Sequence, residues 1–256
     1  MNATVANDQK VPSVAMDVDG DFVVVWEGVS AANGKEIYAR RYQADGTPEV
    51  QGEFVVNTNS NGDEKNPFVA MDDAGNFVVA WETPDPVVGT NIDFQRFDNT
   101  GTKVGAEIQV NTTDGLKHKE AKVAMDPNGG FVFIWEAVDA GLDAGIFAEL
   151  YDNTGTLVKA QFTVNTTTAD KQQDASVSMD DSGNFVVTWT SSNQDGGGDG
   201  VYAQRFNSLG VADVQGEFLV NTTTTAGNQQ QSSVAMVGNG EFVVAWQSAE
   251  DRKSVV

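Results

Sequence analysis

The stretch Phe22-Val23-Val24-Val25-Trp26 decides the fold, because close variants of it return four more times along the chain. Each copy ends in a tryptophan, and successive tryptophans are 54 to 57 residues apart. The five copies end at Trp26, Trp81, Trp135, Trp189 and Trp246. Methionine keeps the same steps, at Met16, Met71, Met125, Met179 and Met236. Two residue types that recur together indicate a tandem repeat of one unit of about 54 residues.

Each unit is predicted to contain four short strands. In the first unit, strand one is Ser13–Met16, and the turn Asp17-Val18-Asp19-Gly20 follows it. Asp accepts hydrogen bonds from its own turn and Gly tolerates a positive φ, so this is hairpin chemistry. The second strand, 22–26, is apolar on both faces and must therefore be covered on both sides. Strands three and four are Ile37–Tyr42 and Glu53–Asn57.

Four short strands per unit, with central strands buried on both faces, are typical of β-propeller blades, which pack face to face. The sequence therefore predicts an all-β fold: a β-propeller-like array of four-stranded antiparallel blades, with about five repeats and the last incomplete. A β-sandwich pair or an elongated β-array is the alternative, although sandwiches rarely keep so regular a period. We expect one repeat domain over 1–256, with units at approximately 1–56, 57–110, 111–164, 165–220 and 221–256 (partial).

The two ends of the chain fall inside repeat units. Met1-Asn2-Ala3-Thr4 aligns with the end of strand four in the next unit, Val56-Asn57-Thr58. Ten residues follow Trp246, whereas the aromatic residue that closes strand three stands 16 or 17 residues after each earlier tryptophan. We expect four whole units and one hairpin, with the missing strands supplied by a second copy or a neighbouring domain, or an open ring.

The charge balance excludes some partners. The chain has 37 acidic and 15 basic residues and a formal net charge of −22. A phosphate backbone or an anionic membrane surface would be repelled, so neither nucleic acid nor membrane is an expected partner. Cysteine is absent, which excludes disulfides and thiolate metal sites. No apolar run reaches 18 residues, so membrane insertion is not expected.

The repeat pattern resembles that of a known family. The residues that carry the resemblance are Ser13–Asp17, Gly20–Trp26, Val201–Phe206 and Glu217–Thr223. They are similar to a repeat of very large secreted or surface proteins of bacteria, often found beside hemolysin-type calcium-binding repeats. The resemblance implies an extracellular or cell-surface location, a role in adhesion or surface structure, and calcium. The hairpin also looks like the Asp-box hairpin of sialidase-type propellers, although Met rather than Ser or Thr precedes the Asp.

Two acidic loops are candidate calcium sites, because calcium takes oxygen ligands from carboxylates and backbone carbonyls. One is the turn Asp17-Val18-Asp19-Gly20-Asp21, and the other is Asp195-Gly196-Gly197-Gly198-Asp199-Gly200. The predicted metal ligands are Asp17, Asp19, Asp21, Asp195 and Asp199. The alternatives are ordinary turn chemistry, since the last unit has the turn Val237–Gly240 without Asp, and a flexible glycine-rich loop. Weaker versions of the second loop are Asn33-Gly34, Asp85-Pro86 and Asp139 to Asp143.

Catalytic residues are not predicted. The single histidine, His118, lies between two lysines in a polar link, outside the expected core strands. The prominent carboxylates recur in every unit, whereas a catalytic pair is expected to be singular. The recurring Arg41, Arg96 and Arg205 are interpreted as guanidinium groups that bridge strands and lock each blade.

The resulting functional hypothesis is a non-catalytic extracellular scaffold, adhesion or binding module of a larger secreted or surface bacterial protein, with calcium as a candidate stabilising ion. Its partners would be other domains of the same chain, neighbouring copies, glycans or surface proteins. One alternative is a carbohydrate-binding repeat lectin with equivalent glycan sites between blades. The other is a propeller-fold glycosidase or lyase, which needs a cleft lined by residues that break the repeat.

Overall fold

A computed structural model describes residues 8–30, 34–59, 62–111, 115–138, 145–223 and 226–249. Within these residues the chain forms 18 strands in five antiparallel sheets and no helix. The predicted all-β, propeller-like array with an incomplete last repeat is confirmed. The calls that rest on Met1–Thr4, Asn33, residues 139–143 and the segment after Ala249 lie outside the described residues.

Each of the first four blades is a four-stranded sheet whose strands follow chain order. Blade 1 contains β1 (Gln9–Met16), β2 (Phe22–Ser30), β3 (Gly34–Tyr42) and β4 (Pro48–Val55). Blade 2 contains β5 (Lys65–Met71), β6 (Phe77–Asp85), β7 (Gly89–Phe97) and β8 (Lys103–Gln109). Blade 3 contains β9 (Lys117–Met125), β10 (Phe131–Val138), β11 (Gly145–Tyr151) and β12 (Leu157–Thr163). Blade 4 contains β13 (Gln172–Met179), β14 (Phe185–Ser192), β15 (Asp199–Phe206) and β16 (Phe218–Leu219). Blade 5 is the hairpin of β17 (Gln229–Met236) and β18 (Phe242–Ser248).

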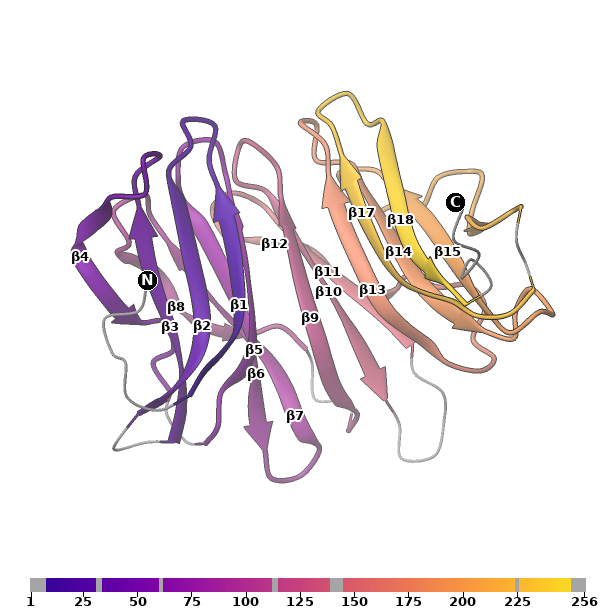
Figure 1. The fold of residues 1–256 in the computed structure, drawn as a ribbon, viewed down its shortest axis with the longest axis horizontal. Helices are drawn as coiled ribbons and strands as arrows, with labels where there is room; N and C mark the ends of the chain where they lie inside the picture. The colour runs from indigo at the N-terminus through magenta and orange to yellow at the C-terminus, as the bar shows by residue number, and fades with distance from the viewer. Residues whose placement is uncertain are drawn as a thin grey trace, which may run out of the picture.

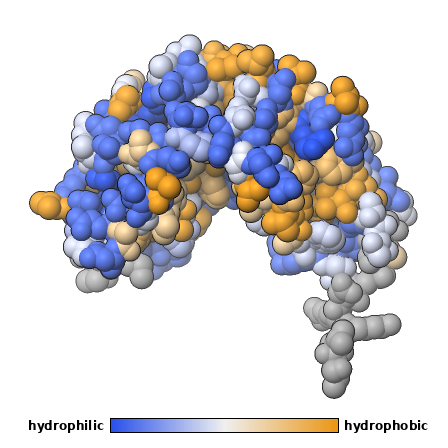
Figure 2. Space-filling model, turned by 90° about the horizontal axis from the view of Figure 1, so that it is seen from above, coloured by the Kyte–Doolittle hydropathy of each residue, from blue (hydrophilic) through white to orange (hydrophobic). Residues whose placement is uncertain are grey.

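The blades follow one another along an arc. The first strand of each blade contacts the first strand of the next, from β1 through β5, β9 and β13 to β17. These five strands therefore lie closest to the axis of the arc, side by side in Figure 1. Seen from above, the molecule is an arch with a hollow concave side (Figure 2). Blade 1 and blade 5 lie at opposite ends of the arc (Figure 1).

The tryptophans fill the boundaries between blades. Trp81, Trp135 and Trp189 are fully buried, as the repeat predicts. Trp81 belongs to one apolar cluster with Val23 and Val25 of the preceding blade. In blades 2, 3 and 4 the tryptophan face therefore packs against the preceding blade, and the opposite face of the sheet packs against the following one. This alternation explains why the second strand is apolar on both sides.

The Asp-Gly turns form as the sequence predicts. Asp17 Oδ1 accepts hydrogen bonds from the backbone N–H groups of Asp19 (3.0 Å) and Asp21 (2.9 Å). Gly20 has a φ of +90°, the left-handed conformation that glycine adopts without strain. The same pattern of bonds recurs at Asp72, Asp126 and Asp180. Blade 5 closes the same backbone turn, from Val237, without an Asp.

Two sequence interpretations need correction. His118 is not outside the core strands: it lies in β9 and is buried, with Nδ1 3.1 Å from Nδ2 of Asn111. Strand β9 begins at Lys117, before the apolar residues that mark the strand in the sequence. Its first residues still pair with β10, although a bulge separates them from the rest of the strand. The guanidinium of Arg205 bonds to Asp213 within blade 4, as interpreted. That of Arg96 instead locks blade 2 to blade 3, since it donates to the carbonyl oxygens of Asn153 (2.7 Å) and Thr154.

No helix in the part of the chain that the structure describes has the length and apolar character needed to cross a membrane.

Candidate functional site

A bulge interrupts the first strand of every blade at the same place. The pairing with the second strand shifts there in β1, β5, β9, β13 and β17. One residue in each bulge is not glycine and yet has a φ between +50° and +56°. These residues are Val11, Asn66, Glu120, Asp174 and Gln231. Such a conformation costs on the order of 1–3 kcal/mol and persists where the surroundings enforce it, which is common at functional sites.

The bulge residues lie on the first strands of the blades, the innermost strands of the arc, and they differ in chemistry. The repeat keeps the backbone conformation, but the side chain is apolar, amide or acidic depending on the blade. Val11, Asn66 and Glu120, with their chain neighbours, line one pocket across the first three blades. Carboxylates stand at this position only in blades 3 and 4, as Glu120 and Asp174. A residue with the same structural role in every blade would recur in every blade, and these two carboxylates do not.

The residue after each of the three fully buried tryptophans, Trp81, Trp135 and Trp189, holds the bulge of the following blade in place. Glu82 Oε1 accepts the backbone N–H of Glu120 at 2.8 Å. Glu136 Oε1 accepts the backbone N–H of Asp174 at 2.6 Å. In the next blade the hydroxyl of Thr190 accepts the N–H of Gln231 at 3.2 Å. Glu82 and Glu136 therefore clamp neighbouring blades, and they fix the backbone that carries the acidic side chains of Glu120 and Asp174.

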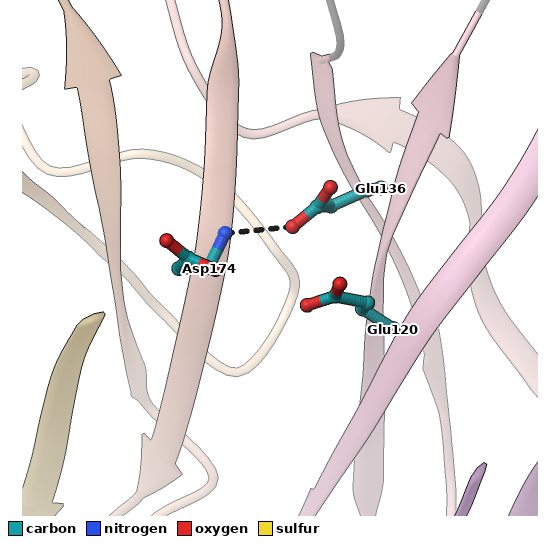
Figure 3. A group of neighbouring side chains, drawn as sticks. All are labelled: Glu120, Glu136 and Asp174. Carbon is teal, nitrogen blue, oxygen red and sulfur yellow. Dashed lines mark hydrogen bonds between the residues drawn. The ribbon is translucent and has the colours of Figure 1, made fainter. Parts of the chain in front are cut away.

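Glu120, Glu136 and Asp174 form the carboxylate cluster. One carboxylate oxygen from each lies within 4.8 Å of the others. Glu120 comes from β9, Glu136 from β10 and Asp174 from β13, and the two glutamate carboxylates point toward β13 (Figure 3). Glu120 is exposed, Asp174 is half-buried and Glu136 is buried. Lys119 Nζ lies 2.7 Å from Glu136 Oε2, so the deepest carboxylate is paired with a cation.

The environment biases Asp174 toward its protonated form. Burial is the largest cause that raises the pKa of Asp174, and the charge of Glu120 raises it further. Lys119 opposes this shift without reversing it. Burial also raises the pKa of Glu136, against the hydrogen bond and charge of Lys119. Neighbouring carboxyl groups in different environments are a common feature of sites that perform acid–base chemistry.

The cluster is also the one group of acidic side chains, among the described residues, that is compact enough to hold a cation. None of the five predicted calcium ligands belongs to it. Asp17 and Asp195 accept hydrogen bonds within their own turns, Asp195 from the N–H of Gly197 at 2.9 Å. Asp21 accepts the N–H of Ala44 at 2.9 Å, and Asp199 accepts a hydrogen bond from Gln230. Calcium at these loops stays a prediction.

Sequence reasoning missed Glu120 and Asp174, although the sequence contains a signal for them. Both stand five residues before the repeat methionine, as do Val11, Asn66 and Gln231. When the five units are aligned on that methionine, this position changes residue type from unit to unit, although the strand around it recurs. The prediction that every prominent carboxylate recurs was based on the Asp residues of the turns and did not consider this position.

Blade 2 contains a second departure from the repeat, deeper in the fold. Glu64 occupies the position of Gln172, whose Oε1 accepts the Nε1–H of Trp189 at 2.9 Å in blade 4. Asp93 lies opposite Trp81, where the other complete blades place an aromatic residue. Burial raises the pKa of Glu64 to about 7 and that of Asp93 to about 6. Both are buried, so neither is placed to contact a substrate.

No family model and no curated protein matches this chain. Among solved structures, it is similar to the α-L-arabinanase of Penicillium chrysogenum, with a TM-score of 0.64 and 13% identity over 94% of this chain and 76% of that one. The endo-arabinase of Bacteroides thetaiotaomicron has a TM-score of 0.53 and 12% identity, over 98% of this chain and 93% of that one. An ulvan lyase has a TM-score of 0.59 and 10% identity, over 94% of this chain and 61% of that one. At these identities the likeness shows a shared β-propeller fold.

These neighbours contradict the prediction of a non-catalytic scaffold and the prediction that the chain is not an enzyme. The fold is one that glycosidases and a polysaccharide lyase use. The argument against catalysis depended on every prominent carboxylate being repeated, and Glu120 and Asp174 are not. The findings favour the alternative that the sequence left open, a propeller-fold glycosidase or lyase.

Proposed function

We propose that this chain is a glycoside hydrolase that cleaves a polysaccharide on the concave side of the arc. The observation that carries the proposal is the pair Glu120 and Asp174. The five blades share one bulge, two adjacent blades place a carboxylate there, and the cluster brings these carboxylates within 4.8 Å of each other. Two carboxylates that differ in burial are the machinery of glycoside hydrolysis.

The environments of the two residues assign their roles. Asp174, whose pKa is raised by burial, donates its proton to the glycosidic oxygen as the bond to the anomeric carbon breaks. Glu120, which is exposed and has a carboxylate oxygen within 4.8 Å of one from Asp174, attacks the anomeric carbon and forms a glycosyl ester. Asp174 then takes a proton from water, and that water displaces Glu120. The short spacing of the carboxylates favours this two-step route with retention of configuration.

Glu136 and Lys119 act as positioning residues in this scheme. Glu136 accepts the N–H of Asp174 and so fixes the strained backbone that carries the acid. Lys119 pairs with Glu136 at 2.7 Å and lies 3.7 Å from Glu120 Oε1. Its charge offsets part of the repulsion among three neighbouring carboxylates.

A neutral polysaccharide is the substrate class that the charge of the chain supports. A net charge of −22 repels a polyanion such as the glucuronate- and sulfate-bearing ligand named for the ulvan lyase. The arabinanase neighbours suggest arabinan as the first polymer to test. A polymer of this kind does not cross membranes, which supports the expected extracellular location.

The test is release of reducing ends from linear arabinan and from other neutral polysaccharides. We expect Glu120→Gln and Asp174→Asn each to lower the rate by on the order of 10²–10⁴-fold. Asn66→Gln and Gln231→Asn change the same bulge position in other blades, and they are expected to leave the rate near that of the wild type. Absence of cleavage by the wild type, or equal effects of all four substitutions, would overturn the proposal.

A further inference from the structure

The arc ends in two different surfaces. The front face is the exposed side of blade 1, where Val14 and Met16 are 62% and 61% exposed. The back face is the exposed side of blade 5, where Val243 is 67% exposed and Ala235 and Ala245 are also exposed. Ala235 pairs with Val243 across the hairpin, so the three apolar residues of the back face lie together.

Both surfaces are buried wherever the repeat continues. The positions equivalent to Val243 are fully buried in all four preceding blades, at Val23, Val78, Val132 and Val186. The positions equivalent to Val14 in blades 2 and 3, Val69 and Val123, are both 3% exposed. Inside the arc, the cover on a back-face valine is the front face of the next blade, as the cluster of Val23, Val69 and Trp81 shows. The back face of blade 5 and the front face of blade 1 therefore match the two sides of the contact that neighbouring blades make inside the arc.

A backbone hydrogen bond accompanies this contact. Ser13 Oγ on the back face of blade 1 accepts the N–H of Val69 at 3.3 Å. Ser176 Oγ on blade 4 accepts the N–H of Val234 in the same way, also at 3.3 Å. Ser233 holds the equivalent position on the back face of blade 5 and is exposed. The N–H group that matches it by repeat position is that of Val14.

We propose that a second copy of this chain binds head to tail, with the front face of one arc packed on the back face of the other. Val14 and Met16 of one copy cover Val243 and Ala235 of the next, and Ser233 Oγ accepts the N–H of Val14. This interface is heterologous, because each copy uses a different surface. Since successive blades already follow one curve, copies added in this way continue that curve, into a closed ring or an open helical array. The inference is independent of the proposed hydrolase activity.

The charge of the chain predicts how the association responds to salt. Two copies that each have a net charge of −22 repel each other at low ionic strength. Salt screens this repulsion but leaves apolar burial intact, so association should strengthen as salt is added. An interface held by ion pairs would weaken instead.

The experiment is a mixing test by sedimentation velocity. Val14→Glu disables the front face and Val243→Glu disables the back face, so each variant alone should be a monomer. An equal mixture should form a heterodimer, because one intact front face and one intact back face remain. Met16→Glu with Ala235→Glu is a second pair for the case that a first variant misfolds. Val87→Glu, at an 89% exposed valine outside both faces, is the control and should assemble like the wild type.

A wild-type chain that stays monomeric at all protein and salt concentrations would assign these faces to another partner and overturn the proposal. Folded single variants that remain monomers after mixing would do the same. Assembly that Val87→Glu weakens as much as Val14→Glu does would indicate non-specific association and would also overturn it.

Discussion

Replacing Glu64 with Gln restores the amide found at this position in blades 1, 4 and 5, and it isolates the effect of one buried carboxyl group on stability. Glu64 is 1% exposed, and its pKa is raised from 4.5 to about 7, first by burial and then by neighbouring carboxylates such as Asp93. The nearby hydroxyl of Thr83 donates to Asp93 at 2.6 Å. The folded state therefore keeps the proton of Glu64 in a pH range where the unfolded chain has lost it.

The direction of the pH dependence follows from this difference. Between pH 4.5 and about 7 the folded state binds more protons than the unfolded state, so stability falls as pH rises. The contribution of Glu64 is fully present below its unfolded pKa and is lost as pH rises through about 7. A rise of this size corresponds to a loss on the order of 3 kcal/mol above pH 8. Glu64→Gln should recover about that amount at pH 8.5 and change little at pH 4.5.

Urea unfolding followed by tryptophan fluorescence, at several pH values from 4.5 to 8.5, measures this effect. Gln172→Glu is the matched control, because it places the same carboxyl group in the corresponding site of blade 4. It should introduce the loss of stability that Glu64→Gln removes. A difference between Glu64→Gln and the wild type that is the same at every pH, or a variant less stable than the wild type at pH 8.5, would refute the reasoning.

Three further predictions concern the core, the proposed catalytic pair and calcium. Trp135→Ala should lower the free energy of unfolding by about 3–5 kcal/mol in urea titrations, since Trp135 is fully buried; a loss below ~1 kcal/mol would contradict this. Hydrolysis should fall as pH rises through the raised pKa of Asp174, and Lys119→Gln should move this limb to higher pH, because Lys119 lowers that pKa; an unmoved limb would exclude Asp174 as the acid. Millimolar calcium should raise the melting temperature, and the combined substitutions Asp195→Asn and Asp199→Asn should abolish the rise. A melting temperature that changes with neither calcium nor a chelator would contradict the calcium prediction.

The architecture could be predicted because its signals are local and repeated. The spacing of Trp81, Trp135 and Trp189 sets the repeat, and their burial follows from strands that are apolar on both faces. The turn at Asp17 forms as expected because the carboxylate and its two N–H donors are at most four residues apart. Each of these features depends on residues close together in the sequence.

The site could not be predicted in the same way, because contacts between blades create it. The bulge at Glu120 is held by Glu82, 38 residues earlier, and that at Asp174 by Glu136, also 38 residues earlier. Nothing next to Glu120 in the sequence signals a positive φ. His118 was misplaced for the same reason, since its part of β9 pairs with β10 beyond the bulge and lacks an apolar pattern of its own.

Covalent labelling tests the proposed hydrolase most directly. The probe is a 2-deoxy-2-fluoro-α-L-arabinofuranosyl fluoride, which forms the glycosyl ester but releases it slowly. Mass spectrometry of the labelled protein and its peptides should show one sugar adduct, located on Glu120, and the Glu120→Gln variant should stay unlabelled. An unlabelled wild-type chain, or an adduct on a different residue, would contradict the account.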